Sequence, residues 1–344
     1  MMNKGLFSLF VGIWTLLVPL SAVAADPIVL TFAMQNPETA FSSVQCVTPW
    51  IKAVEEASGG KVKIQPYYSQ TLTKGKDSWN ATKTGIADMS WNMHGYWPGM
   101  TPLADVISLP VMPFRTAEQG SEIFWKLYEK FPQIQKEFEE TKVLILYTSE
   151  PYYLVTKDRP VKTMEDLKGM KIRSGGGPAV DQMTALGGVP VSMGMPDVYM
   201  AMQKGVIDGT GAAWEPIIGF RLYEVGNFYS EVPLPATYFS ITMNKRKWNS
   251  LPKEAQEAIM SVSGLEGAKY WGRNFWDIAK EPTIQKAKEM GKEIKVYTLT
   301  AEERQRWLDI GGKPVWEKWV REMESKGHSG AREILQTALE LGEK

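Results

Sequence analysis

The chain has 344 residues, a length that predicts about two domains. Its 39 lysines and arginines balance its 39 aspartates and glutamates, so the formal net charge is zero. Proteins that bind nucleic acid or a membrane surface usually carry a basic excess, so this balance argues against both kinds of partner. The 44% hydrophobic content is enough for a sizeable core.

The first 25 residues have the pattern of a targeting segment. Lys4 supplies a positive charge, residues 6–20 form an apolar run, and Ala22-Val23-Ala24 is a small-residue cleavage motif. The apolar run is shorter than the roughly 20 residues that a membrane-spanning helix needs. We therefore expect residues 1–24 to be a cleaved signal peptide, with a retained anchor as the alternative, and the mature protein to be exported.

Cysteine and histidine are scarce. Cys46 is the only cysteine, so no intramolecular disulfide can form, and we expect its thiol to be buried in the core. His94 and His328 are far apart in the sequence and do not form a transition-metal site with one cysteine. A site for a hard cation built from carboxylates and carbonyls stays open, and no cofactor is predicted.

The first half of the chain alternates strands and helices. Strands are predicted at 28–33, 62–67 and 89–92, and helices at 42–57 and 74–84. This order predicts a parallel or mixed sheet with right-handed crossovers. An aromatic loop at 94–102, a helix at 117–131, strands at 143–148 and 152–156, and a candidate domain crossing near Glu150 and Pro151 follow.

Residues 167–196 read as a β-α-β unit. A strand at 170–173 ends at Arg173, three glycines follow at 175–177, and a helix opens at Pro178. Ligands of open α/β sheets bind beyond the carboxyl ends of the strands, where a guanidinium can hold a carboxylate or phosphate. An ordinary surface arginine is the alternative. The glycines lack the Lys-Ser/Thr of a phosphate-binding loop, so we interpret them as backbone room for a ligand.

The second half of the chain continues the alternation of predicted strands and helices. A strand is predicted at 189–193, a helix at 196–203 and a strand at 206–208; the loop 211–216 enters a helical stretch that runs to about 225. Residues 253–290 read as nearly one helix, which Pro282 should kink or break. The other predicted elements are strands at 238–244 and 294–298 and helices at 300–325 and 329–341.

Several aromatic residues fall where a predicted strand meets a loop. Together with Arg173 they indicate a small-molecule site with mostly apolar walls. Glu215 most simply caps the following helix, although it could also face the ligand or help to hold a cation. Met195 precedes a helix and could line the same cleft. The aromatic residues are Tyr96, Trp97, Tyr152, Tyr153 and Trp214.

Several motifs resemble those of one known family. They include Met-Glu-Asp-Leu-Lys-Gly-Met-Lys-Ile-Arg at 164–173, Leu-Gly-Gly-Val-Pro-Val at 186–191 and Gly-Val-Ile-Asp-Gly at 205–209. With these segments the chain resembles the extracytoplasmic solute receptors of tripartite ATP-independent periplasmic (TRAP) transporters, of the DctP type, over about residues 27–340.

The resemblance implies a two-lobed α/β periplasmic binding protein fold. Mixed sheets form the two lobes, the ligand cleft lies between them, and a long helix spans both. Lobe I would comprise residues 25–150 and about 239–278, and lobe II residues 151–238 and about 279–330. Residues 331–344 would form a C-terminal helix or tail.

The resemblance also implies roles for individual residues. In this family the arginine of the Lys-Ile-Arg motif, Arg173 here, pairs with the substrate carboxylate. Tyr153 and Ala212 replace an arginine and an asparagine of sialic-acid receptors, which argues against that ligand. Trp214-Glu215 is similar to the pair in receptors for monocarboxylates, and in some members this glutamate helps to hold a metal ion. The candidate ligand contacts are Arg173, Trp214, Tyr153, Asn92, Gln35, Tyr96, His94, Met195, Glu215 and Gly177.

The predicted function is that of a periplasmic substrate-binding subunit for a small organic acid. The ligand would be a monocarboxylate, either aromatic or a 2-oxo or 2-hydroxy acid, delivered by a monomer to the small and large TRAP membrane subunits. A C4-dicarboxylate receptor of the same type and an ABC-type solute-binding protein are the alternatives. An enzyme on this scaffold would need His94 as its base.

Overall fold

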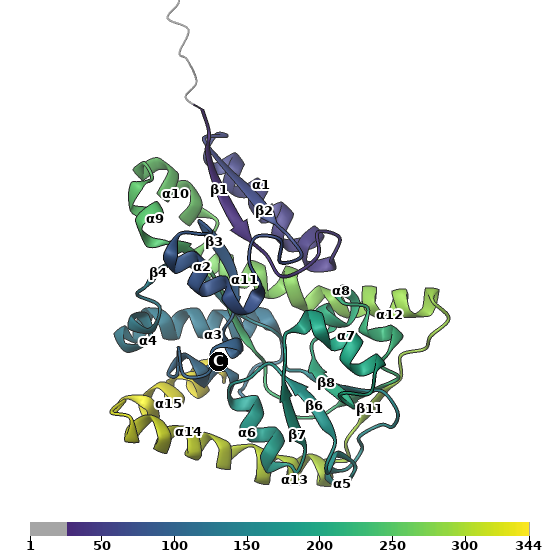
Figure 1. Ribbon diagram of the computed structural model, residues 1–344. Helices are drawn as coiled ribbons and strands as arrows, with labels where there is room; N and C mark the ends of the chain where they lie inside the picture. Colours follow the sequence, from purple (N-terminus) through teal and green to yellow (C-terminus); the bar gives the residue numbers. More distant parts are fainter. Residues whose placement is uncertain (1–25, 344) are drawn as a thin grey trace, which may run out of the picture.

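The computed structural model describes residues 26–343 and contains two mixed β-sheets (Figure 1). The first sheet has the strand order β2-β1-β3-β10-β4, in which β10 runs antiparallel to both of its neighbours. All seven residues of β10 are buried, as expected for a central strand covered on both faces. Its strands are β1 (Ile28–Ala33), β2 (Val62–Tyr67), β3 (Met89–Met93), β4 (Thr141–Thr148) and β10 (Tyr238–Asn244).

The second sheet has the order β11-β9-β5-β8-β6-β7. We call each sheet with the helices packed on it a lobe, lobe I for the first sheet and lobe II for the second. The predicted two-lobed α/β fold with mixed sheets is thereby confirmed. The strands of lobe II are β5 (Tyr153–Thr156), β6 (Lys171–Ser174), β7 (Val189–Ser192), β8 (Gly209–Ala212), β9 (Phe228–Glu231) and β11 (Val296–Thr298).

Two chain crossings between the lobes lie side by side. Residues 149–152 connect β4 to β5, and residues 232–237 connect β9 to β10. The Ser149 N–H donates to the Thr237 carbonyl at 2.9 Å, and the Tyr152 N–H donates to the Pro235 carbonyl at 3.4 Å. The two crossings therefore form one hydrogen-bonded hinge.

A third crossing is helical. The helix α11 (Gly264–Trp271) packs on lobe I and continues through a π-helical turn, Gly272–Trp276, and a 3₁₀ turn, Asp277–Ala279, into α12 (Lys280–Glu289). Figure 1 shows this path leaving lobe I and running to α12 beside α8 (Trp214–Gly219). A Cβ on Gly272 would stand 2.6 Å from the Ala117 carbonyl oxygen, so the close packing of this turn needs glycine.

The predicted single helix over 253–290 is wrong in detail. The segment α10 (Lys253–Ser261) is separate, because Ser263 is extended and Gly264 has a positive φ of 65°. Pro282 lies in the first turn of α12, where a missing N–H costs little, and the irregular turns lie just before it.

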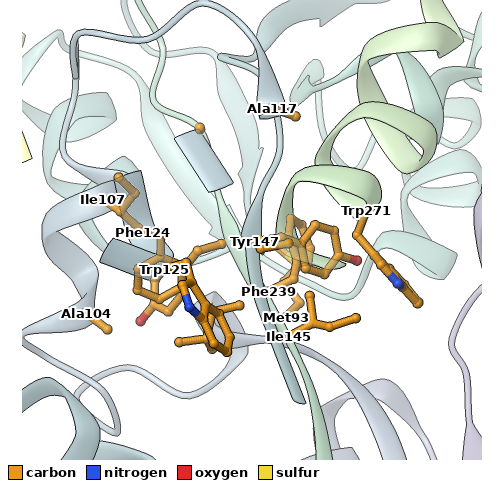
Figure 2. Close-up of a cluster of buried hydrophobic side chains, with 14 of the residues drawn as sticks. Met93, Ala104, Ile107, Ala117, Phe124, Trp125, Ile145, Tyr147, Phe239 and Trp271 are labelled. Carbon is orange, nitrogen blue, oxygen red and sulfur yellow. The ribbon is translucent and has the colours of Figure 1, made fainter. Parts of the chain in front are cut away.

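Lobe I has a core rich in aromatic side chains (Figure 2). Tyr147 of β4 packs against Phe239 of the neighbouring strand and against Trp271 and Phe275 of the third crossing. The Trp91 indole donates to the Tyr147 hydroxyl at 2.6 Å, which satisfies both buried polar groups. Cys46 is buried here, as predicted. The helices on this lobe are α1 (Thr48–Ala57), α2 (Ser78–Thr84), α3 (Ala117–Lys130), α4 (Pro132–Glu137) and α9 (Lys245–Ser250).

The C-terminal helices connect the lobes again. The predicted helix at 300–325 is two helices, α13 (Ala301–Gly311) and α14 (Lys313–Ser325), separated at Gly312, and both pack on α6 (Pro178–Ala185) of lobe II. The Trp319 indole of α14 donates to the Pro102 carbonyl of lobe I at 3.0 Å. The last helix, α15 (Ala331–Gly342), packs on α3 and so belongs with lobe I (Figure 1).

Two strands of lobe II differ from the sequence prediction. The strand expected at 206–208 is β8, at Gly209–Ala212, and β9 was not predicted at all. The Gly-Thr-Gly-Ala sequence of β8 has low strand propensity, but a Cβ on Gly209 would stand 2.5 Å from the Val155 carbonyl oxygen. Glycine is therefore needed for close pairing with β5. The remaining helices of lobe II are α5 (Met164–Leu167) and α7 (Met195–Gln203).

The expected signal peptide, residues 1–24, lies outside the described residues. Within residues 26–343, no helix combines the length and the apolar character needed to cross a membrane.

Candidate ligand-binding site

Arg173 lies in β6, which is hydrogen-bonded on both sides by β7 and β8. This interior position leaves the side chain only 1% exposed. Its Nε donates to the Met193 carbonyl at 3.1 Å, while neither terminal nitrogen has a hydrogen-bond partner in the described part of the chain. A buried guanidinium without an anion is costly, so this arrangement is suited to receive a carboxylate through two parallel hydrogen bonds.

A small cavity lies between the lobes; Arg173 is not itself in its wall but is connected to it through two lining residues. We call it the cleft cavity, and its volume is about 20 Å³. Met93 and Tyr152 line it and also flank Arg173: a Cβ on Gly175 would stand 3.7 Å from the Arg173 Nη2 and would overlap the Met93 methyl group. Burial raises the pKa of Tyr152, and the positive charge of Arg173 acts in the opposite direction.

The walls of the cleft cavity are mostly aromatic. Trp91, Phe239, Phe275 and Trp276 extend the aromatic core of lobe I to this surface, with Phe239 and Trp276 ring centroids 5.0 Å apart. Phe220, Pro216 and Met195 close the cavity from lobe II. The polar groups at the wall are Gln35, Asn36 and Glu215. An apolar ring with one anionic end would match these surroundings.

Glu215 connects the lobes rather than capping its own helix. Its Oε1 accepts hydrogen bonds from Asn36 Nδ2, at 3.2 Å, and from the Ser42 hydroxyl, both in lobe I. The backbone N–H of Trp214 is instead bound by Glu150 Oε1 at 3.0 Å, so the expected capping role of Glu215 is wrong. Burial raises the pKa of Glu215 to about 7, because the charged form is desolvated.

Tyr96 makes a second connection between the lobes. Its hydroxyl donates to Gln35 Oε1 at 2.9 Å within lobe I and accepts from the Met195 N–H at 3.1 Å in lobe II. Gln35, Tyr96 and Met195 are therefore brought together at one end of the cleft cavity.

The three glycines provide room for the other lobe. A Cβ on Gly176 would overlap the Gly95 carbonyl oxygen, and a Cβ on Gly95 would overlap the Gly175 carbonyl oxygen. Gly177 has φ 64°, and its Cα faces Asp105 of lobe I, with 3.7 Å between a Cβ built there and the carboxylate. The interpretation of these glycines as backbone room for a ligand is thus replaced by direct backbone contact between the lobes.

Trp214 and Tyr153 lie away from the cleft cavity. Their rings are 4.8 Å apart, Trp214 also stacks on Tyr229, and both Trp214 and Tyr153 line a different cavity at the hinge. Tyr152 faces the cleft cavity instead. Neighbouring residues at the start of a strand point to opposite faces, and the sequence does not tell which face borders the cleft.

Asn92 and His94 are engaged within lobe I. Asn92 Oδ1 accepts from Ser78 at 2.9 Å, and its Nδ2 donates to Thr242 at 2.9 Å. His94 bonds to Ser240 at 2.8 Å and stacks on Tyr238, and burial lowers its pKa to about 3. The neutral imidazole lines neither cavity, so the geometry gives no support to a catalytic base.

The sequence prediction did not select the aromatic walls. Trp91 and Met93 border the cleft cavity, whereas the candidate set took Asn92 from the same strand and His94 from the turn that follows it. Strict alternation along β3 could have divided these residues into two faces. Phe239, Phe275 and Trp276 come from distant segments, and no local signal in the sequence joins them.

Comparisons with known proteins identify the family of this chain. A family model, DctP, described as bacterial extracellular solute-binding protein, family 7, matches residues 32–323. The chain belongs to the DctP family. The resemblance inferred from its motifs is therefore confirmed, and the chain is a TRAP solute-binding protein for transport, not an enzyme.

Solved structures of similar proteins carry aromatic acids. A TRAP solute-binding protein from Rhodoferax ferrireducens, in complex with benzoate, is 28% identical with a TM-score of 0.86, covering 92% of this chain and 98% of that one. A marine metagenome protein specific for aromatic acid ligands, in complex with 3-hydroxybenzoate, is 28% identical with a TM-score of 0.86 and covers 93% and 99%. The C4-dicarboxylate-binding periplasmic protein DctP of Rhodobacter capsulatus is 24% identical over 319 residues, 90% of this chain and 92% of the relative.

No group of three or more potential metal ligands among histidine, cysteine, aspartate and glutamate occurs within residues 26–343. Glu215 has amide and hydroxyl groups as its hydrogen-bond partners, which suits a carboxylate held by donors.

Proposed function

We propose that this DctP-family protein captures an aromatic monocarboxylate between its lobes and delivers it to TRAP membrane permease subunits from the periplasm. The observation that carries the proposal is the buried guanidinium of Arg173, whose two terminal nitrogens have no hydrogen-bond partner within residues 26–343. A carboxylate held there would gain two charge-assisted hydrogen bonds, and lobe closure would strengthen them by excluding water.

The lining of the cleft cavity favours a ligand with an apolar body and a single charge. The ring of the ligand would pack against Trp91, Phe239 and Trp276, where offset or edge contacts between rings are favourable. A second carboxylate would meet the buried Glu215 and would be repelled or require a proton. Similar proteins described with benzoate and 3-hydroxybenzoate support the same class of ligand.

The size of the cleft cavity bears on how the ligand enters. About 20 Å³ holds little more than one water, so a benzene ring needs the lobes to part or side chains to move. Met93 and Met195 are unbranched and adaptable, so they can give way at modest cost. Binding in this proposal therefore couples ring entry to the hinge and to a rearrangement of these two side chains.

Thermal-shift and calorimetric titrations with matched compounds test the proposal. Benzoate, 3-hydroxybenzoate and mandelate should stabilise the protein, by about 2.7 kcal/mol at 100 times the dissociation constant. Benzyl alcohol, which keeps the ring but lacks the carboxylate, should not. Stabilisation by succinate but not by the aromatic acids would contradict the proposal and favour a C4-dicarboxylate receptor.

A further inference from the structure

A second and larger cavity lies at the hinge. We call it the hinge cavity; its volume is about 600 Å³, within the range of small-molecule sites. All three chain crossings contribute to its wall, through Glu150, Leu234 and Asp277. Tyr152 separates it from the cleft cavity, because this side chain lines both. The aromatic-acid site described above does not account for this space.

The interior of the hinge cavity carries an unsatisfied carboxylate oxygen. Glu150 is 8% exposed, and its Oε1 accepts from the Trp214 N–H. Glu150 lines the hinge cavity, and its Oε2 is buried behind this wall with no hydrogen-bond partner in the part of the chain that the structure describes. A buried polar atom in this state costs free energy until it meets a donor. A ligand that presents a hydroxyl or ammonium group at its inner end would supply one.

The rim of the hinge cavity is cationic. Arg115, Lys280 and Arg304 all line it, and all three are exposed. None of them has a carboxylate within 4.0 Å among residues 26–343, whereas fifteen other ion pairs do form there. Two acids also line this cavity. Glu231 is exposed, and Asp277 uses both oxygens to bind the backbone N–H groups of Ala117 and Glu118, so the three cations outnumber the rim acids by one.

Apolar side chains form part of the wall between rim and floor. Met112, Phe114 and Leu234 contribute aliphatic and aromatic surface, and the Tyr153 and Trp214 rings complete it. From its mouth inward, the hinge cavity therefore presents first positive charge, then apolar side chains and finally a hydrogen-bond acceptor. An inorganic anion would use only the first of these, and a purely apolar molecule only the second.

We propose that the hinge cavity is a second ligand site, distinct from the cleft, for a small organic anion with an apolar body and a hydrogen-bond donor at the opposite end. The anionic group is held by Arg115, Lys280 and Arg304, and the donor binds Glu150 Oε2. Because the three crossings form the wall, the shape of this site changes when the lobes rotate, so its occupancy is linked to lobe position.

Calorimetry with 4-hydroxybenzenesulfonate tests the site directly. This probe has a fixed negative charge, an aromatic body and a donor at the far end. We expect one equivalent to bind the full protein and the R115Q/K280Q/R304Q variant to bind it at least tenfold more weakly. The three side chains are exposed, so the variant should fold normally. The variant K52Q/K61Q/K204Q removes three exposed cations outside this cavity and should keep the wild-type affinity.

Two further comparisons separate the hinge cavity from the cleft. Arg173→Gln should leave binding of the probe unchanged, and benzenesulfonate, which lacks the donor, should bind severalfold more weakly than the probe. The proposal is overturned if wild type fails to bind the probe, if Arg173→Gln abolishes binding while the triple hinge variant retains it, or if the two sulfonates bind equally. Because the probe is itself an aromatic anion, the Arg173→Gln comparison separates binding in the hinge cavity from binding in the cleft.

Discussion

The hydroxyl of Tyr96 in lobe I accepts a hydrogen bond from the backbone N–H of Met195, 3.1 Å away, at the start of α7 in lobe II. The same hydroxyl donates to Gln35, so its proton is committed and its oxygen is oriented toward the other lobe. Together with Glu215 and the contact between Gly95 and Gly176, it holds the two lobes in a closed arrangement.

Tyr96→Phe should weaken ligand binding by about 1–2 kcal/mol, because each lost hydrogen bond contributes roughly 0.5–1.5 kcal/mol. Calorimetric titration with benzoate measures this loss. Tyr68→Phe is the matched control, since among the described residues the Tyr68 hydroxyl pairs only with Thr48 of the same lobe. Equal affinities in wild type and Tyr96→Phe would show that this bridge does not stabilise the bound form.

Arg173→Gln should reduce the affinity for an aromatic carboxylate by about 2–5 kcal/mol, because it removes the buried partner of the ligand charge. Lys171→Gln is the control in the same strand, where the side chain is exposed. Calorimetry on both variants measures the difference, and circular dichroism checks that they fold. Retained affinity in Arg173→Gln would refute the assigned role.

Gly95→Ala should prevent complete closure. Its Cβ would overlap the Gly175 carbonyl oxygen, which belongs to the backbone and cannot turn away as a side chain would. In small-angle X-ray scattering, wild type saturated with ligand should become more compact than this variant does. Gly330→Ala is a control, because a Cβ there meets its nearest atom at an ordinary 3.6 Å. The same compaction in wild type and Gly95→Ala would contradict the closure contact.

Glu215→Gln should make stability less dependent on pH. The pKa of Glu215 is raised from its usual 4.5 to about 7, so the folded state binds the proton more tightly than the unfolded state does. The contribution of Glu215 to the free energy of unfolding is therefore at its maximum below about pH 4.5. This contribution falls by about 1–3 kcal/mol as the pH rises through 7.

Urea denaturation from pH 5 to pH 8 measures this slope. Burial also raises the pKa of Glu150 and Asp105 to about 7, but both groups titrate in wild type and in the variant. The difference therefore reports Glu215 together with the smaller effect of its charge on Glu150. His94 has the opposite effect on the pH dependence. Because its pKa is lowered in the folded state, the unfolded state binds the proton more tightly, and the free energy of unfolding falls as the pH drops below about 6.5. Parallel pH profiles for wild type and Glu215→Gln would rule out the titration of Glu215.

The strands β1, β2 and β10 match their predicted bounds, and β6 begins one residue later than expected and extends to Ser174. Alternation of apolar residues and glycine or proline boundaries are local signals, so they can be read from the chain alone. The position of Arg173 within the last two residues of β6 follows from the same pattern. Strand β8 was displaced in the prediction because its glycines serve close pairing, which depends on a neighbouring strand.

The sequence by itself determined the α/β class, the family motifs and the position of Arg173 near the end of a strand of lobe II, because each of these depends on a short run of residues. The tertiary structure alone decided that Tyr152 rather than Tyr153 faces the cleft cavity, that Trp214 lines the hinge cavity, and that the glycines after Arg173 meet the other lobe. These outcomes depend on which face of each sheet is turned toward the other lobe, and that choice is made by packing between segments more than 50 residues apart.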